Sequence, residues 1–236
     1  MNKTIVVTGA GRGLGYNIAM LHLEMKDHVY AYDYALTDEL KHLEEGTDLL
    51  RIQQCDIAVT DSVVNAMQEV LENGKQIDIL YNVAGVFSYK EKVGLAETDL
   101  DMCTSMYNIN AVGALRVCKA ALPLLSSGTV IINISSEAGS IGNCWREQEY
   151  SYCMSKAALN MGSKIMSNEF SKRAVRVLNF HPGWMRTAMG GQPAMESSNS
   201  VSPEESARDI VKIALEIDKI PKDQLYMEHT GKPLPW

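Results

Sequence analysis

The chain has 236 residues, of which 46% are hydrophobic and 22% are charged, and its formal net charge at pH 7 is −7. This balance is typical of a globular protein with a sizeable core, so it excludes intrinsic disorder and collagen-like repeats. Lys and Arg never gather into a basic stripe, which argues against a nucleic-acid partner. No apolar stretch is long enough to cross a bilayer, and the N-terminus enters a strand pattern without a signal peptide. The sequence therefore predicts a cytoplasmic protein with no membrane attachment.

The cysteines and histidines carry no metal or disulfide signature. Five cysteines form an odd, widely spaced set without a CxxC pair, and five histidines are equally scattered. Neither a disulfide framework nor a zinc site has the spacing it needs. We expect reduced thiols and no bound metal.

Short β-rich runs alternate with amphipathic helical stretches along the whole chain. The predicted strands are 3–8, 28–33, 49–55, 77–83, 129–135, 175–181 and 224–228. The predicted helices are 14–26, 60–73, 99–126, 152–172 and 203–218, with cap residues expected at Thr60, Thr98 and Ser202. Such a βαβ series predicts an α/β fold: one domain over residues 1–236, built on a seven-stranded parallel sheet with helices on both faces.

A low-complexity patch, MGGQPAMESSNSVSP at 189–203, is the one interruption in the series. Small and polar residues of this kind favour a mobile loop inside the domain.

The stretch TGAGRGLG, residues 8–15, follows the first strand and opens the first helix. In that context backbone N–H groups and the helix N-terminus hold the pyrophosphate of a dinucleotide. The spacing is T-G-x-x-x-G-x-G, with Gly9, Gly13 and Gly15 in place. Alone this is weak evidence, because turns and helix caps also collect glycine.

Asp33 strengthens the dinucleotide interpretation. It ends the second strand 20 residues after Gly13, where a carboxylate can accept hydrogen bonds from the ribose hydroxyls and repel a 2′-phosphate. The alternative is that Asp33 only starts a turn. Arg12 is a counter-signal, because it is a candidate partner for a phosphate. The balance predicts NAD, with NADP less favoured.

The stretch EYSYCMSKAALN, residues 149–160, holds two tyrosines and one lysine. Residues four apart lie side by side on a helix, so Lys156 pairs with Tyr152 and not with Tyr150. A free phenol titrates near pH ~10, and an adjacent ammonium would stabilise the phenolate. Lowering that pKa by ~3 units requires roughly 4 kcal/mol, which needs a cleft. By itself the spacing is common on any helix.

Further motifs accompany this pair in order along essentially the whole chain. They are Asp56 in CDIAVTD, NVAG at 82–85, Asn110 in NINAVG, INISSEAG at 132–139, YCMSK, and HPGWMRT at 181–187. Together with TGAGRGLG they resemble the short-chain dehydrogenase/reductase family. PGWMRTAMGG and the terminal GKPLPW further resemble its C-signal-like and sniffer-like carbonyl reductase branch. The resemblance implies a Rossmann-type doubly wound domain.

The resemblance also implies a chemistry: NAD(P)-dependent hydride transfer between nicotinamide and a carbonyl or secondary alcohol. Its implied catalytic residues are Asn110, Ser136, Tyr152 and Lys156, with Ser135 as the fallback serine. Asn110 would position a water for a proton relay. The implied cofactor-binding residues are Gly9, Arg12, Gly13, Leu14, Gly15, Asp33, Asp56, Ile57, Asn82, Ala84, Gly85, Tyr152, Lys156, Pro182, Gly183 and Thr187.

Two departures from the family pattern are visible. Val83 replaces the second asparagine of N-N-A-G, and we expect cofactor binding to survive this. The interval from Ser136 to Tyr152 is 16 residues, a little longer than the commonest spacing, so the loop beside the substrate is altered.

Residues 184–202 are expected to form a substrate lid, with Gly190 and Gly191 as hinges and apolar cover from Trp184, Met185, Met189 and Met195. Candidate pocket walls are Phe87, Cys144, Trp145 and Trp184. The expected partners are a small carbonyl or alcohol substrate and a second copy of the chain, in a homodimer or homotetramer paired through helices 99–126 and 152–172. Two rival functions remain: a non-catalytic NAD-binding regulator, and a sugar-nucleotide epimerase or dehydratase, which usually carries a longer C-terminal region.

Overall fold

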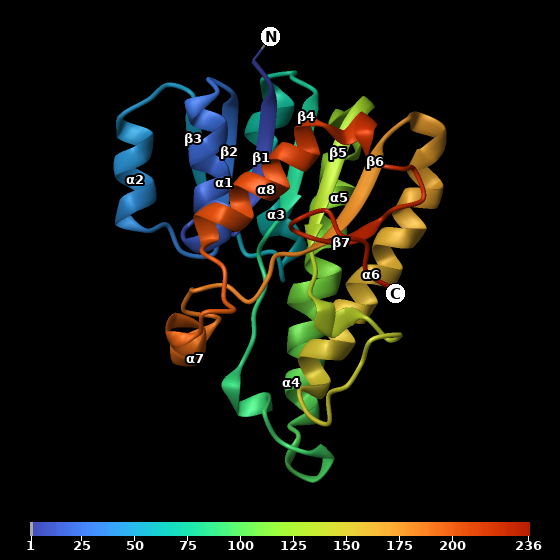
Figure 1. Ribbon diagram of the computed structural model, residues 1–236. Coiled ribbons are helices and arrows are strands. Elements are labelled where there is room, and N and C mark those ends of the chain that lie inside the picture. Colours follow the sequence, from blue (N-terminus) through green and yellow to red (C-terminus); the bar gives the residue numbers. More distant parts are fainter. Residues whose placement is uncertain (1) are drawn as a thin grey trace.

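Seven parallel strands form one sheet in the computed structural model, which describes residues 2–236 (Figure 1). The spatial order is β3-β2-β1-β4-β5-β6-β7. The strands are β1 (Thr4–Thr8), β2 (His28–Asp33), β3 (Leu50–Gln54), β4 (Ile77–Asn82), β5 (Leu125–Ile134), β6 (Arg176–His181) and β7 (Tyr226–Glu228). This confirms the predicted α/β fold and its seven-stranded parallel sheet.

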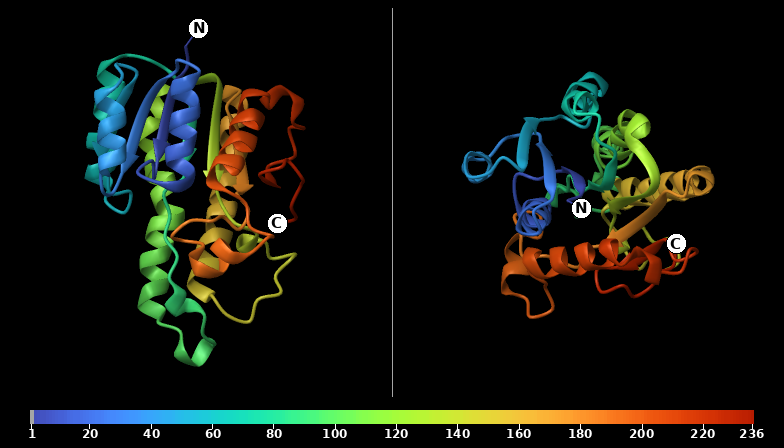
Figure 2. Two further views of the ribbon diagram at one scale, coloured as in Figure 1. Left: turned by 60° about the vertical axis from the view of Figure 1, so that its left-hand side comes forward. Right: turned by 90° about the horizontal axis from the view of Figure 1, so that it is seen from above.

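Helices cover both faces of the sheet (Figure 2). They are α1 (Gly13–Glu24), α2 (Asp38–Glu45), α3 (Thr60–Glu72), α4 (Leu100–Tyr107), α5 (Ala114–Ala121), α6 (Tyr150–Phe170), α7 (Gly191–Glu196) and α8 (Pro203–Leu215). Apolar side chains of α1 and α8 pack on one face, and those of α3, α5 and α6 pack on the other. All five residues of β1 are buried, as expected for a strand covered on both sides.

The predicted helix 99–126 is divided by a π-helical turn, Asn108–Gly113, which separates α4 from α5. The guanidinium of Arg116 donates to the Asn108 carbonyl at 3.2 Å and to Asn108 Oδ1 at 2.6 Å, so it competes with the regular helical ladder. Gly113 also lies close to the loop between β3 and α3, because a Cβ at this position would lie only 2.7 Å from Ile57 Cδ1. Turns of this type often occur at functional sites.

Part of the predicted mobile loop, 189–203, is helical. α7 occupies Gly191–Glu196, and its Ala194 is fully buried. α2 was also not predicted, because its sequence DELKHLEE buries Leu40 as its one core residue and shows no apolar stripe.

The carboxyl ends of the strands carry the loops expected to form the site. Figure 1 shows α4, the start of α6, and α7 extending beyond this end of the sheet. β1 has β2 on one side and β4 on the other, so the loops after β1 and β4 part in opposite directions and leave the crevice at which such sheets bind ligands. A buried row of Asn82, Asn133 and Asn179, paired in register across β4, β5 and β6, lies just beneath these loops.

Candidate active site

Ser136 and Tyr152 meet where β5 ends and α6 begins. Ser136 lies two residues beyond β5, and its Oγ accepts a hydrogen bond from Ala138 N at 3.2 Å. Tyr152 is in the first turn of α6, and Phe87 packs edge-on against its ring with centroids 5.1 Å apart. Loss of hydration around the phenol raises the pKa of Tyr152 to about 12, and a hydrogen bond with the Ser136 hydroxyl works against this rise.

Lys156 lies one turn further along α6 and is only 4% exposed. Its Nζ donates to the Ile134 carbonyl at 2.8 Å and lies 5.7 Å from the centroid of the Tyr152 ring. Burial lowers the pKa of Lys156 to about 8. The predicted side-by-side placement of Tyr152 and Lys156 is therefore present.

The expected lowering of the Tyr152 pKa by Lys156 is not seen in this structure. Dehydration of the phenol is the largest cause of its raised pKa, and the ammonium of Lys156 donates to the Ile134 carbonyl. A depressed pKa in the complex with an oxidised nicotinamide stays a prediction.

Asn110 lies in the π-helical turn and is 1% exposed. Its Oδ1 accepts from Val86 N at 2.7 Å, and its Nδ2 donates to Val86 O at 2.9 Å and to Ser155 Oγ at 3.0 Å. The side chain thus ties the loop after β4 to α6. Its role in a proton relay stays a prediction.

The glycine loop fits a dinucleotide. Gly9 has φ +70°, and a Cβ there would approach Ala84 Cα to 2.7 Å; a Cβ at Gly15 would approach Gly9 O to 2.1 Å. Gly13, by contrast, faces open space except for Thr187 Cγ2 at 3.4 Å. No side chain caps α1, so its first N–H groups have no side-chain acceptor and are suited to a pyrophosphate. Arg12 is exposed at this end of the helix, whereas Leu14 packs into the core.

Asp33 braces this loop. Its Oδ2 accepts from Gly11 N at 2.7 Å and its Oδ1 accepts from Ala35 N at 3.1 Å. Each carboxylate oxygen can accept a second bond, so the ribose role predicted for Asp33 remains open to it.

The residues after β3 support the neighbouring loops. Asp56 Oδ1 accepts from Ala58 N at 2.8 Å, and Ile57 is buried against Gly113. Both belong to the predicted adenine side of the site.

The residues after β4 divide into sheet and loop. Asn82 points into the sheet, where its Nδ2 donates to Asn133 Oδ1 at 2.8 Å. Thr8 Oγ1 accepts from the N–H groups of Val83 and Ala84 at 3.2 and 3.3 Å, so Val83 needs no polar side chain to hold this turn. Gly85 faces two of the residues predicted to be catalytic, since a Cβ there would lie 3.1 Å from Asn110 Oδ1 and 3.5 Å from Lys156 Nζ.

The segment after β6 returns to the glycine loop. The carbonyl of Pro182 accepts from Ser206 Oγ at 2.8 Å, and Gly183 adopts φ +83°. Thr187 Oγ1 accepts from Gly190 N at 3.2 Å while its methyl group faces Gly13. Thr187 thus lies beside the turn predicted to hold the cofactor.

Several contacts of the site were not predicted. Tyr89 donates to Gly190 O and connects the loop after β4 with the predicted lid. Tyr226 donates to the carbonyl of Ser136. Of the proposed walls, Phe87 lies against Tyr152, whereas Trp145 is 77% exposed and stacks on Arg146. No sequence periodicity joins these residues, because each contact connects different loops.

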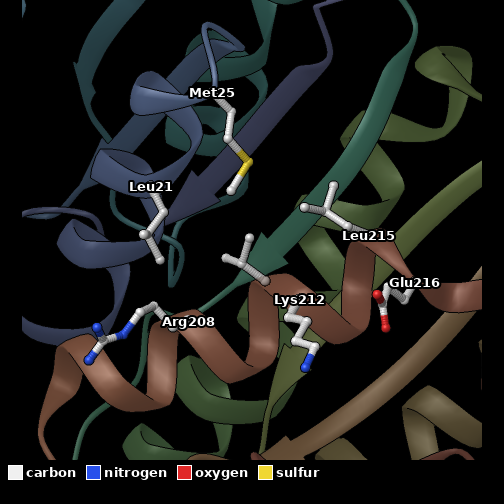
Figure 3. A pocket seen from close by; sticks show the side chains of 7 residues that line it. Leu21, Met25, Arg208, Lys212, Leu215 and Glu216 are labelled. Atoms are coloured by element: carbon white, nitrogen blue, oxygen red, sulfur yellow. The ribbon is translucent and has the colours of Figure 1, made fainter.

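The hollow between α1 and α8 has a volume of about 280 Å³ and lies apart from these residues (Figure 3). Leu21, Met25 and Leu215 face it, and the lining also includes Arg208, Val211, Lys212 and Glu216. It contains none of the predicted site residues. Of the helices formed by residues 2–236, none combines the length and apolar character required to span a bilayer.

Comparison with known proteins assigns the family. A sequence model of the short chain dehydrogenase family matches residues 3–196. The chain belongs to this family. Its similarity to C-signal of Myxococcus xanthus, 31% identical over 68% of this chain and 93% of that protein, agrees with the predicted branch of this short-chain dehydrogenase.

Solved structures of carbonyl reductases share the whole fold of this short-chain dehydrogenase. The NADPH-bound carbonyl reductase from chicken fatty liver is 28% identical, with a TM-score of 0.89 over 100% of this chain and 99% of that one. The carbonyl reductase Sniffer of D. melanogaster is 26% identical, with a TM-score of 0.87 over 100% of both chains. The expected sniffer-like branch is confirmed.

Proposed function

We propose that this short-chain dehydrogenase is an NAD-dependent oxidoreductase that interconverts a small carbonyl compound and a secondary alcohol. The observation that carries the proposal is the meeting of Ser136, Tyr152 and Lys156 at the end of the sheet where the uncapped α1 and the glycine loop lie. The nicotinamide would supply or receive the hydride at the carbonyl carbon.

The proton chemistry belongs to the chain itself. In carbonyl reduction, Tyr152 Oη donates its proton to the substrate oxygen, and the Ser136 hydroxyl donates a hydrogen bond that orients that oxygen. Dehydration of the phenol, which raises the pKa of Tyr152 to about 12, keeps the proton in place until it is needed. In alcohol oxidation the same phenol must first be ionised, and the positive charge of Lys156 supports that form.

NAD is proposed over NADP because of Asp33. Its carboxylate lies beside Gly11 N, and a 2′-phosphate in that crevice would meet a like charge. NADP is the second candidate: Arg12 is exposed at the same loop, and the similar chicken enzyme binds NADPH.

Titration of both dinucleotides tests this choice. The wild type is expected to bind NAD at least ~10-fold more tightly than NADP, since a hydrogen bond to a charged group contributes roughly 1.5–3 kcal/mol. Asp33→Ser should weaken NAD binding and strengthen NADP binding. Asp33→Asn is the control, because it keeps an acceptor for Gly11 N while it removes the charge and the acceptor for Ala35 N. Tighter NADP binding by the wild type would overturn the assignment.

Residues 184–202 are proposed as the substrate lid. Trp184, Met189 and Met195 are each 44–49% exposed, and Tyr89 connects the segment to the loop beside Tyr152. Such a surface suits an apolar substrate body.

A homodimer or homotetramer is part of the proposal. α6 exposes Met154, Met161 and Ile165, each more than half accessible, on the helix predicted to pair. A second copy would cover this apolar row. The proposal also includes a cytoplasmic location, which the five free cysteines support.

A non-catalytic NAD-binding regulator is the rival, and it would have no use for the Ser136, Tyr152 and Lys156 set. A screen of carbonyl compounds and secondary alcohols, read by nicotinamide absorbance with each cofactor, separates the two. Dinucleotide binding without turnover of any compound would favour the regulator.

A further inference from the structure

An arginine clamp, formed by Arg146 with Glu137 and Glu149, spans the loop between Ser136 and Tyr152, the two groups proposed to hold the substrate oxygen. Ser136 and Tyr152 are separated by 16 residues, and most of that interval, Ser140–Glu149, contains no helix or strand. Arg146 lies within it, with a side chain only 16% exposed. A loop of this length does not by itself fix the distance between its ends.

Arg146 joins both ends of the loop. Its Nη1 and Nη2 donate to the two oxygens of Glu137 at 2.6 Å each, and its Nε donates to Glu149 Oε2 at 2.8 Å. Glu137 directly follows Ser136, and Glu149 is the residue from which α6 starts, three positions before Tyr152. One planar guanidinium therefore connects the residue next to Ser136 with the residue at the start of α6. A lysine ammonium cannot make these three bonds in the same geometry.

The far end of the clamp is itself held. Glu149 adopts φ +65°, ψ +39°, a left-handed conformation that a residue with a Cβ seldom takes. Its N–H donates to Glu91 O at 3.0 Å, and the buried carboxylate of Glu91 accepts from Ser151 N at 3.2 Å. The start of α6 is thus fixed from the loop after β4 as well as from Arg146.

We propose that Arg146 is a positioning residue that, through Glu137 and Glu149, fixes Ser136 relative to Tyr152 across their long connecting loop. The inference rests on the proposed function, because it takes these two residues as the groups that bind the reacting oxygen. Arg146 and Glu149 lie outside the motifs that carry the family resemblance, whereas Glu137 lies within INISSEAG.

The clamp also has an electrostatic consequence. Besides burial and the bond with Ser136, the groups whose charge acts on Tyr152 are Glu137 and Cys153, which raise its pKa, and Arg146, which lowers it. The other titratable groups packed here are Lys156 on α6 and Tyr226 on β7. Removing one member of the Arg146–Glu137 pair therefore leaves the other charge uncompensated beside the phenol.

Variants of the clamp test the inference through rate and cofactor binding. We expect Arg146→Gln to lower kcat/KM by about 100-fold and Arg146→Lys by about 10-fold, since small misplacements of reacting groups cost this much. Dinucleotide affinity should stay within about 2-fold in both, because the clamp is remote from the glycine loop. Arg51→Gln, which breaks an exposed pair with Glu69, is the matched control and should leave the rate unchanged.

The pH–rate profile for alcohol oxidation gives a readout that a merely structural role would not move. Arg146→Gln should shift the rising limb to higher pH, because Glu137 then disfavours the phenolate. Glu137→Gln should shift it to lower pH, and the double variant should return toward the wild type. Shifts of the same sign in both single variants would overturn the inference.

Amide hydrogen exchange tests the clamp without activity. In Arg146→Gln, the backbone of residues 137–152 should exchange at least about 10-fold faster, while the glycine loop is unchanged. If Arg146→Gln left both exchange and kcat/KM at wild-type values while Tyr152→Phe was inactive, the clamp would be wrong and the proposed function would stand. If the wild type turned over no carbonyl compound or alcohol, the proposed function would fail, and the exchange result alone would decide whether the clamp exists.

Discussion

One turn of α6 carries two ionisable groups whose pKa values burial moves in opposite directions. It raises that of Tyr152 to about 12 and lowers that of Lys156 to about 8. Both shifts favour the neutral form of the side chain. A phenol and an amine that both resist ionisation are poised for proton exchange once a charged ligand enters beside them.

Tyr152→Phe should abolish turnover while dinucleotide affinity stays within about 2-fold, because only the phenolic hydroxyl is lost. Tyr150→Phe is the matched control on the same helix and should keep most of the activity. Rates and cofactor titrations of the two variants check this. An inactive Tyr150→Phe beside an active Tyr152→Phe would refute the pairing of Tyr152 with Lys156.

Lys156→Met should stabilise the protein at neutral pH even as it removes activity. In the folded state the pKa of Lys156 is about 8 instead of the ordinary 10.5, so the unfolded chain binds more protons between these values. Below pH 8 the wild type carries the whole destabilisation that comes from burying a charged ammonium. This destabilisation decreases as the pH rises and is lost near pH 10.5. The variant's advantage should be about 1–3 kcal/mol at pH 7 and shrink by pH 10.

Urea unfolding of wild type and Lys156→Met at pH 7, 8.5 and 10 measures the difference. The comparison ends at pH 10 because Tyr152, whose pKa is raised, begins to destabilise the folded state above that value in both proteins. An advantage for Lys156→Met that grew with pH would contradict the expectation.

At the scale of elements, predictions held where one segment determines its own structure. The fully buried β1, with the sequence TIVVT, and the Ser202 cap, which accepts from Glu205 N at 3.1 Å, follow from local sequence. Thr98 and Thr60 do not cap: Asp99 caps α4, and Val59 precedes α3 without a side-chain bond. A one-residue shift of this kind follows from loop geometry that short-range patterns do not contain.

The same distinction applies to the site. The Tyr152–Lys156 pair could be predicted because a helix fixes residues four apart. Two other features could not be predicted: the bond of Tyr89 to Gly190, and the folding of part of 189–203 into α7. The loops after β4 and β6 come into contact only in the folded molecule.

Tyr89→Phe should loosen the lid. The variant keeps the ring beside Phe87 and loses only the bond to Gly190 O, so KM should rise by about 2- to 10-fold with little change in dinucleotide affinity. Tyr107→Phe is the control, since this tyrosine on α4 is 49% exposed. Steady-state kinetics with one substrate checks both, and equal KM values would refute a role for Tyr89 in holding the lid.

At the scale of the whole molecule, a buried polar cluster joins α1 to β4. His22 Nδ1 contacts Asp27 Oδ2 at 2.8 Å, and its Nε2 contacts the Tyr81 hydroxyl at 3.0 Å. Burial lowers the pKa of His22, although Asp27 acts in the opposite direction. The imidazole is therefore neutral in the folded protein at neutral pH.

Acid should destabilise the fold through this histidine. Below about pH 6.5 His22 binds a proton in the unfolded chain but not in the folded protein. The free energy of unfolding therefore decreases as the pH is lowered, until the pH reaches the lowered pKa of folded His22. His22→Gln should be less stable at pH 7.5 but lose less stability between pH 6.5 and 5. Thermal unfolding of both proteins at pH 7.5, 6.5 and 5 checks this. His181, whose pKa burial also lowers, retains part of the slope in the variant, so an unchanged slope would contradict the assignment to His22.

The strand order has a consequence for how the protein is assembled. β1 and β4 are neighbours at the middle of the sheet although Val6 and its partner Leu80 are separated by more than 70 positions along the chain. The glycine loop, residues 8–15, and Asp33 precede β4 along the chain, and every group proposed for proton transfer follows it. A ligand that spans the crevice would act as a staple between the two halves, and it would slow their separation during thermal or proteolytic attack more than it slowed the fraying of either outer edge.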